Sequence, residues 1–211
     1  MGKIKYIHKL RKFFKKNPVV NITSIKNLIV SYGGKKNYTY LLINYLLKKR
    51  EIKRITKSFY TIYEDPAIVV FCFKPAYVGL QDALSIHDLW EQETNPVIIT
   101  TKKARQGVRK IFNTNVIIKR ISLKYFFGFK YMKQDNFYIP VSDVEKTFID
   151  MVYFNQGLDK NLLKNFKEKI DIKKLKKYLE KYPKRTSNKV LKLILNINSL
   201  SLKRLIKPTQ E

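Results

Sequence analysis

The period of the apolar positions changes within residues 35–63, and this change is the clearest structural signal in the chain. Across residues 38–46 the apolar side chains recur at spacings of three and four, which predicts a helix with one buried face. That face is expected to consist of Tyr38, Leu41, Leu42, Tyr45 and Leu46. From residue 52 to 62, apolar positions alternate imperfectly with basic residues and threonines around Lys57-Ser58, as in a short two-stranded hairpin. A helix followed by a basic hairpin is the outline of a winged helix.

Two shorter helices are expected before this stretch. The first covers residues 4–14 and is closed by Asn17-Pro18, because the residue before a proline disfavours helical geometry. The second is expected to be capped by Thr23 or Ser24 and to end at Gly33-Gly34. With the third helix starting near Asn37, this gives three helices and a hairpin within about 60 residues, the layout of a winged helix-turn-helix.

The remainder of the chain reads as a mixture of strands and helices. The expected strands cover residues 67–73, 96–101, 115–121, 125–131 and 139–141. The expected helices cover residues 80–89 and, after residue 157, the ranges 158–170, 172–182 and 187–205. After the last expected strand, Ser142 and Glu145 have the S-x-x-E spacing of a capping box. This spacing predicts that a helix starts there, before the apolar residues that follow.

The predicted fold class is therefore α+β, with an N-terminal winged helix-turn-helix followed by a mixed α/β domain and C-terminal helices. We place the winged helix at residues 1–63 and the α/β domain at residues 64–155. Residues 156–211 are expected to form a basic helical extension that packs on the second domain.

The charge is unevenly distributed along the chain, which has 211 residues and a formal net charge of +28. Residues 1–60 hold 16 Lys and Arg against one Asp or Glu, residues 61–160 hold 13 against 11, and residues 161–211 hold 15 against 4. The excess is thus +15, +2 and +11 in the three segments. A lysine-rich solvated surface would account for part of this excess, but its segregation favours a polyanionic partner for the two ends.

The chain has a single cysteine, Cys72, within the apolar run 67–73, so it cannot form an internal disulfide. The basic N-terminus is not followed by the apolar stretch of a signal peptide, and the longest apolar run is too short to span a bilayer. We therefore expect a cytoplasmic protein without a membrane segment.

A winged helix would place its third helix in the major groove of double-stranded DNA, with basic residues neutralising phosphates. The expected phosphate contacts are Lys35, Lys36, Lys48, Arg50, Lys53, Arg54 and Lys57. The expected base contacts are Thr39, Tyr40 and Asn44, on the outward face that also carries Ile43.

No catalytic, cofactor or metal site is expected. Gly33-Gly34-Lys35 lacks the remaining residues of a phosphate-binding loop, and the two histidines and one cysteine fall in separate segments without zinc spacing. An alternative stays open, in which a Mg²⁺-dependent nuclease is docked by the winged helix. Its candidate carboxylates are Glu64, Asp65, Asp82, Asp88, Glu91 and Glu93. A third reading is a general RNA- or chromatin-binding protein that acts by charge alone.

Five blocks between residues 52 and 154 carry a family resemblance. They read IKRITKSFYTIYEDP, KPAYVGLQDALSIHDLWEQ, PVIITTKKAR, YFFGFK and YIPVSDVEKTFIDMVYF. In this order they resemble the AbiEi-like antitoxin family of transcriptional regulators. The most specific matches are the segment 145–150 after a strand, the block 77–84, and Phe127 to Phe129. The resemblance covers about residues 20–155.

The resemblance implies a non-enzymatic repressor and antitoxin of a phage-defence toxin–antitoxin system. Such a protein would bind an inverted repeat in its own promoter, with two copies on the DNA, and would counter a nucleotidyltransferase-like toxin encoded beside it.

Overall fold

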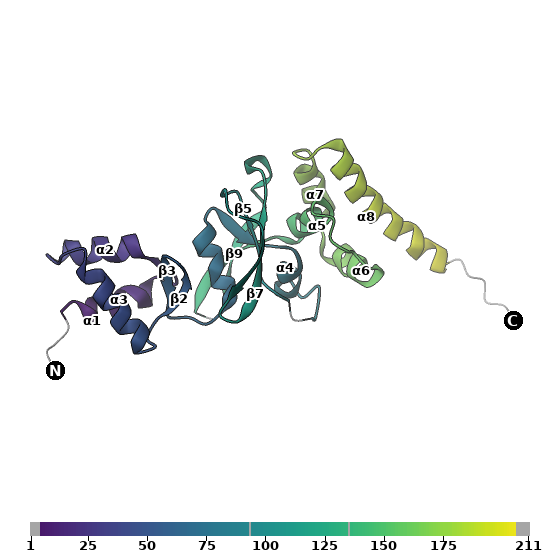
Figure 1. The fold of residues 1–211 in the computed structure, drawn as a ribbon. Coiled ribbons are helices and arrows are strands. Elements are labelled where there is room, and N and C mark those ends of the chain that lie inside the picture. Colours follow the sequence, from purple (N-terminus) through teal and green to yellow (C-terminus); the bar gives the residue numbers. More distant parts are fainter. Residues whose placement is uncertain (1–4, 93, 135, 206–211) are drawn as a thin grey trace.

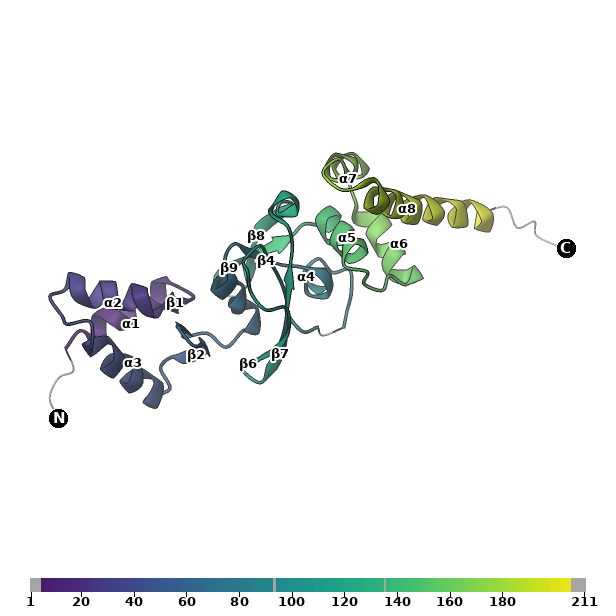
Figure 2. The same cartoon turned by 45° about the horizontal axis from the view of Figure 1, so that its top comes forward.

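The protein is a mixed α+β chain with 47% helix and 21% strand. The structure, a computed structural model, describes residues 5–205 apart from 93 and 135, with side chains through residue 194. Its elements follow one another along an extended molecule, with N-terminal helices at one end, a twisted sheet in the middle and C-terminal helices at the other end (Figures 1 and 2).

The N-terminal unit consists of three helices and a small antiparallel sheet. The helices are α1 (Ile7–Lys16), α2 (Ile22–Ser31) and α3 (Tyr38–Lys48), and the strands are β1 (Val20–Asn21), β2 (Lys53–Thr56) and β3 (Phe59–Thr61), in the order β1-β3-β2. These elements share a hydrophobic cluster that includes Leu10, Phe14, Ile25, Ile29, Leu42, Leu46, Ile52 and Tyr60. The expected three helices and hairpin are therefore present. The first predicted helix begins at residue 4, which lies outside the described residues.

The start of α2 differs from the expectation that Thr23 or Ser24 caps it. Asn21 occupies the cap position, and its side-chain oxygen accepts a hydrogen bond of 2.7 Å from the Ser24 N–H. Asparagine is a strong N-cap because its short side chain reaches the free N–H groups of the first turn. The helix consequently starts earlier, at Ile22.

The central sheet has six strands in the order β6-β7-β5-β4-β9-β8. They are β4 (Ala76–Val78), β5 (Val97–Thr100), β6 (Gly107–Ile111), β7 (Thr114–Arg120), β8 (Phe129–Gln134) and β9 (Phe137–Ser142). The pairs β4/β9 and β5/β7 are parallel and the other neighbours are antiparallel. Two of these strands, β4 and β6, were not expected. Helix α4 (Leu80–Ile86) and a single-turn 3₁₀ helix, η2 (Leu123–Tyr125), lie in the connections.

The expected buried strand at residues 67–73 is wrong, because this segment is a 3₁₀ helix, η1 (Pro66–Phe73). Pro66 opens it, where a missing N–H costs nothing, and Asp65 accepts a hydrogen bond of 2.8 Å from the Ala67 N–H. Most of its side chains are buried in a cluster with the sheet residues Ile98, Ile118 and Ile139. Burial on all sides made the run uniformly apolar, so it had no periodicity that could separate helix from strand.

The C-terminal part begins with α5 (Val144–Tyr153) and continues through α6 (Lys160–Lys169), α7 (Ile172–Leu179) and α8 (Lys184–Leu205). Side chains from all four helices join one hydrophobic cluster with the sheet residues Tyr77 and Ile99. Among the elements that the structure describes, no helix is both long enough and apolar enough to cross a membrane.

The cap of α5 also differs from the expected Ser142–Glu145 capping box. Asp143 is the N-cap and accepts a hydrogen bond of 2.9 Å from the Lys146 N–H. The Ser142 hydroxyl is instead 2.7 Å from the Thr147 hydroxyl, inside the core. The Glu145 side chain is therefore not used to cap α5, and it interacts with the C-terminal helices instead.

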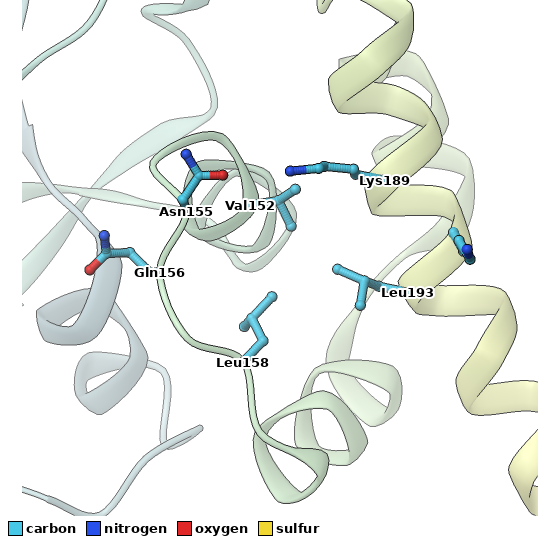
Figure 3. Close-up of a pocket in the computed structure, with 7 residues that line it drawn as sticks. Val152, Asn155, Gln156, Leu158, Lys189 and Leu193 are labelled. Atoms are coloured by element: carbon cyan, nitrogen blue, oxygen red, sulfur yellow. The ribbon is translucent and has the colours of Figure 1, made fainter.

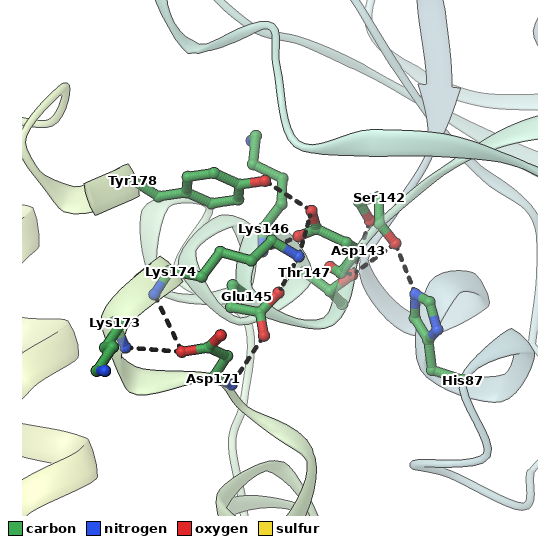
Figure 4. A network of polar contacts seen from close by, with 10 residues as sticks. All are labelled: His87, Ser142, Asp143, Glu145, Lys146, Thr147, Asp171, Lys173, Lys174 and Tyr178. Atoms are coloured by element: carbon green, nitrogen blue, oxygen red, sulfur yellow. Dashed lines mark hydrogen bonds and ion pairs between the residues drawn. The ribbon is translucent and has the colours of Figure 1, made fainter. Parts of the chain in front are cut away.

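A polar network joins the start of α5 to α7 (Figure 4). Lys174 Nζ lies 2.7 Å from Glu145 Oε2 and 3.0 Å from Asp143 Oδ2. Glu145 also accepts a hydrogen bond of 2.9 Å from the Asp171 N–H, and the Tyr178 hydroxyl donates to Asp143 at 2.8 Å. Burial alone would lower the pKa of Lys174, but the hydrogen bonds to Glu145 and Asp143 raise it overall. The network thus holds the α7 ammonium in its charged form against the α5 cap.

Candidate nucleic-acid interface

One stripe of α3 is exposed, and its members are Tyr40, Leu41, Asn44 and Lys48. Their spacing of one, three and four residues places them on one side of the helix. Tyr40 is 49% and Leu41 52% exposed. The stripe therefore presents a hydroxyl, an amide and an ammonium group together with an apolar side chain.

The opposite side of α3 is packed against the N-terminal core. Thr39 and Leu42 are fully buried, and Ile43 is 2% exposed. This corrects the expected base contact from Thr39, since its side chain points into the protein and cannot reach a ligand. It also corrects two placements, because Ile43 was expected on the outward face and Leu41 on the buried one. The helix is rotated about its axis by roughly one residue relative to the prediction.

The turn between α2 and α3 depends on Gly34. A Cβ at this position would lie 2.6 Å from Ile29 Cγ2 and 3.0 Å from the Ile29 carbonyl oxygen. The chain therefore passes directly over the end of α2, which only glycine permits without a shift of Ile29. Lys35 and Lys36 follow at once, and both side chains are exposed immediately before α3.

Tyr40 has a partner that the sequence did not reveal. Lys26, on α2, donates a hydrogen bond of 2.9 Å to the Tyr40 hydroxyl, and its ammonium lies 4.8 Å from the ring centroid. The contact joins α2 to the exposed stripe of α3 and adds a cation there. Lys26 was missed because the two residues are 14 positions apart and on different helices.

The β2–β3 hairpin carries the remaining predicted cations in different environments. Arg54 and Lys57 are exposed, and Arg54 Nη2 donates to the Lys57 carbonyl oxygen at 3.4 Å across the turn. Lys53 forms an ion pair with Glu64 just after the hairpin. An ion pair with a carboxylate leaves Lys53 less available for a phosphate, because the carboxylate would have to be displaced first.

The C-terminal end of α3 is fixed by Arg50 and Glu51. Arg50 has a φ of 55°, the left-handed conformation that ends many helices, and its side chain is exposed. The Glu51 carboxylate accepts two hydrogen bonds from the Arg11 guanidinium, at 2.6 and 2.7 Å. These hydrogen bonds lower the pKa of Glu51. The pair ties α1 to the end of α3 and neutralises the acidic residue nearest the stripe.

Three of the carboxylates of the nuclease alternative, Asp82, Asp88 and Glu91, line one open pocket of about 960 Å³, but they do not form a metal-binding cluster in the part of the chain that the structure describes. There, no three His, Cys, Asp or Glu side chains come close enough to hold a metal ion. Asp65 caps η1, and Asp82 lies on α4 with one oxygen 3.5 Å from the Thr94 hydroxyl. Glu93, the last of the set, lies outside the described residues.

Eight of the ten predicted DNA-binding side chains are therefore exposed, Lys53 is partly exposed and paired, and Thr39 is buried.

Comparison with protein-family models finds no match for this chain, and comparison with curated proteins finds none either.

Proposed function

We propose that residues 1–63 form a winged helix-turn-helix that binds double-stranded DNA, with α3 in the major groove. The observation that carries this proposal is the exposed stripe Tyr40, Leu41, Asn44 and Lys48, on a helix preceded by Lys35 and Lys36. An amide can read adenine, an ammonium can contact a phosphate or guanine, and an apolar side chain can pack on a thymine methyl. The excess charge of +15 in residues 1–60 supports DNA as the partner.

The regulatory role rests on the sequence resemblance. We propose that the protein is a cytoplasmic, non-enzymatic repressor of its own promoter, bound as two copies at an inverted repeat, and an antitoxin against a nucleotidyltransferase-like toxin. Co-expression tests the antitoxin role. The protein should restore growth of cells that express the toxin encoded by the adjacent gene, and continued arrest would refute it.

Asn44→Ala is expected to weaken binding to the preferred DNA site by about 1–3 kcal/mol, with little effect on random duplex. The amide is exposed in the middle of the stripe, so its removal takes away base readout and leaves the charge unchanged. The preferred site is first selected from a library of random duplexes, and affinities are then measured by fluorescence anisotropy. Equal losses on both duplexes would remove Asn44 from the readout set.

Thr39→Val is the matched control for the orientation of α3. Thr39 is adjacent to the stripe in sequence but buried, and its hydroxyl has no hydrogen-bond partner among the described residues. Valine has almost the same shape, so DNA affinity should stay within about twofold of the unmodified protein. A selective loss on the preferred site would mean that the α3 surface meeting DNA is not the exposed stripe.

Lys36→Ala is expected to weaken binding to all duplexes to a similar extent. Its ammonium lies just before α3 and would contact a phosphate, which carries no sequence information. The logarithm of the binding constant should depend less steeply on the logarithm of salt concentration, with a slope smaller by roughly one unit. An unchanged slope would show that Lys36 makes no phosphate contact.

A further inference from the structure

A groove lies between α8 and the C-terminal end of α5 (Figure 3). These two helices lie in the part of the molecule opposite α3 (Figure 1). It consists of two adjoining pockets of about 440 and 240 Å³, which share Val152, Asn155 and Lys189. The other lining residues are Tyr153, Gln156, Leu158, Arg185, Thr186, Lys192 and Leu193. No acidic side chain is among the described residues that line either pocket.

One wall of the groove is a row of three cations on α8. Arg185, Lys189 and Lys192 are exposed and are spaced four and three residues apart, so they lie on the same side of the helix. A rise of about 1.5 Å per residue separates them along the axis by roughly 6 and 4.5 Å. None of the three side chains forms an ion pair or hydrogen bond with another described residue. Figure 3 shows Lys189 extending from α8 toward Val152 and Asn155.

The facing wall and the floor are neutral. Asn155 is exposed at the end of α5, and Val152, Leu158 and Leu193 supply an apolar floor. The phenol of Tyr153 lines the second pocket. A groove with cations on one side, an amide opposite, and an aromatic ring in one of its two pockets has the chemistry that binds a nucleic-acid backbone and its bases.

The spacing of the three cations favours a nucleic-acid strand over a single phosphate as the ligand of the groove. The three cations extend over about 10 Å of an open groove, so a chain of phosphates can meet them successively, whereas one phosphate can meet only one or two. Residues 160–192 also hold 13 Lys and Arg against 3 Asp and Glu. This excess of positive charge around the groove favours a long polyanion over a small anionic ligand.

We propose that this groove binds the phosphodiester backbone of a single nucleic-acid strand through Arg185, Lys189 and Lys192. The site is separate from the α3 stripe and goes beyond the proposed duplex binding. One chain would then hold duplex DNA at its N-terminal end and a single strand at its C-terminal end.

The test compares two triple variants of the full-length protein with equal loss of charge. Arg185→Gln, Lys189→Gln and Lys192→Gln remove the groove cations, and Lys173→Gln, Lys176→Gln and Lys177→Gln remove three exposed lysines of α7 as the matched control. Binding of a labelled 20-nucleotide single-stranded DNA of mixed sequence is followed by anisotropy over a range of salt. We expect about a tenfold or greater loss and a salt slope smaller by about two units for the groove variant, and less than a threefold loss for the control.

Equal losses of single-strand affinity in both variants would overturn the proposal, because binding would then depend on net charge and not on the groove. Unchanged affinity in both variants would also overturn it. Displacement of the strand by an acidic peptide of the same charge would assign the groove to a protein partner. Displacement by submillimolar mononucleotide would assign it to a small phosphate ligand. Both variants should keep the affinity of the unmodified protein for the selected duplex to within a few-fold, so this test and that of the α3 stripe can fail independently.

Discussion

Asp150→Asn is expected to destabilise the protein by about 3–5 kcal/mol, the largest effect of any single substitution considered. Asp150 and Lys146 lie one turn apart on α5, are both fully buried, and form an ion pair. The Asp150 carboxylate also accepts a hydrogen bond of 2.7 Å from the Tyr77 hydroxyl on β4. Its other neighbour is the Tyr182 hydroxyl after α7, at 3.5 Å.

The cost arises because the remaining charge would have no counterion. Burial lowers the pKa of Lys146 and raises the pKa of Asp150, and the charge of each partner opposes the other's shift. With asparagine at position 150, the Lys146 ammonium must either stay charged in the core or lose its proton, and both outcomes cost free energy. The free energy of unfolding is measured by urea denaturation near neutral pH.

A double-mutant cycle provides the control. Adding Lys146→Met to Asp150→Asn removes the stranded charge, fills most of its volume, and leaves the amide oxygen to accept from Tyr77. The double variant should recover at least half of the loss caused by Asp150→Asn. With Lys146→Met alone completing the cycle, the loss in the double variant should be well below the sum of the two single losses. Additive losses would show that the two side chains do not stabilise each other.

Asp82→Asn is expected to stabilise the protein by about 2–4 kcal/mol above pH 7.5. Asp82 lies in the first turn of α4, and its Oδ2 atom is buried without a hydrogen-bond partner among the described residues. Burial, reinforced by the charge of Asp65, raises the pKa of Asp82 to about 7. At neutral and higher pH the folded protein therefore carries a buried carboxylate that water would solvate better.

The sign of the pH dependence follows from this shift. The pKa is higher in the folded chain than the ordinary value of 3.8, so the folded state binds the proton more tightly. The contribution to stability is fully present below about pH 4 and is lost as the pH rises through about 7. Denaturation midpoints between pH 4 and 8 should fall less steeply in Asp82→Asn than in the unmodified protein.

Asp88→Asn is the matched control, because Asp88 follows the same helix but its side chain is exposed. It removes the same charge and should leave the pH dependence of stability nearly unchanged. Parallel curves for Asp82→Asn and the unmodified protein would contradict the raised pKa that burial gives the Asp82 carboxylate.

The outlines of most elements could be read from local sequence. The third helix was expected from Asn37 and begins at Tyr38, and the hairpin turn was expected at Lys57-Ser58, between β2 and β3. The strands around residues 97–100 and 114–120 were likewise expected. These helices, strands and turns depend on short-range sequence patterns, namely the period of the apolar residues, the turn residues and the glycines. They can therefore be recognised within a short window of sequence.

Helix caps were less predictable because several candidates stand side by side. Asn21, Thr23 and Ser24 can all cap α2, and Ser142 and Asp143 can both cap α5. The choice followed from distant contacts, because Asn21 is fixed by pairing with Phe59 in β3 and Ser142 is fixed by pairing with Phe129 in β8. Each pairing lies outside the window in which a cap is recognised.

The sequence by itself determined that the chain is α+β, that both ends are strongly basic, and that a helix with a basic hairpin lies near the N-terminus. The tertiary structure alone decided which side of α3 is exposed. Apolar residues occupy positions 41, 42, 43, 45, 46 and 47, so two rotations of the helix bury similar amounts of apolar surface. Packing against Leu10, Ile25 and Ile29 selects the rotation that buries Thr39 and Ile43 and exposes Leu41. The surface offered to a ligand is thus set by the shape of neighbouring helices, which a one-dimensional pattern does not contain.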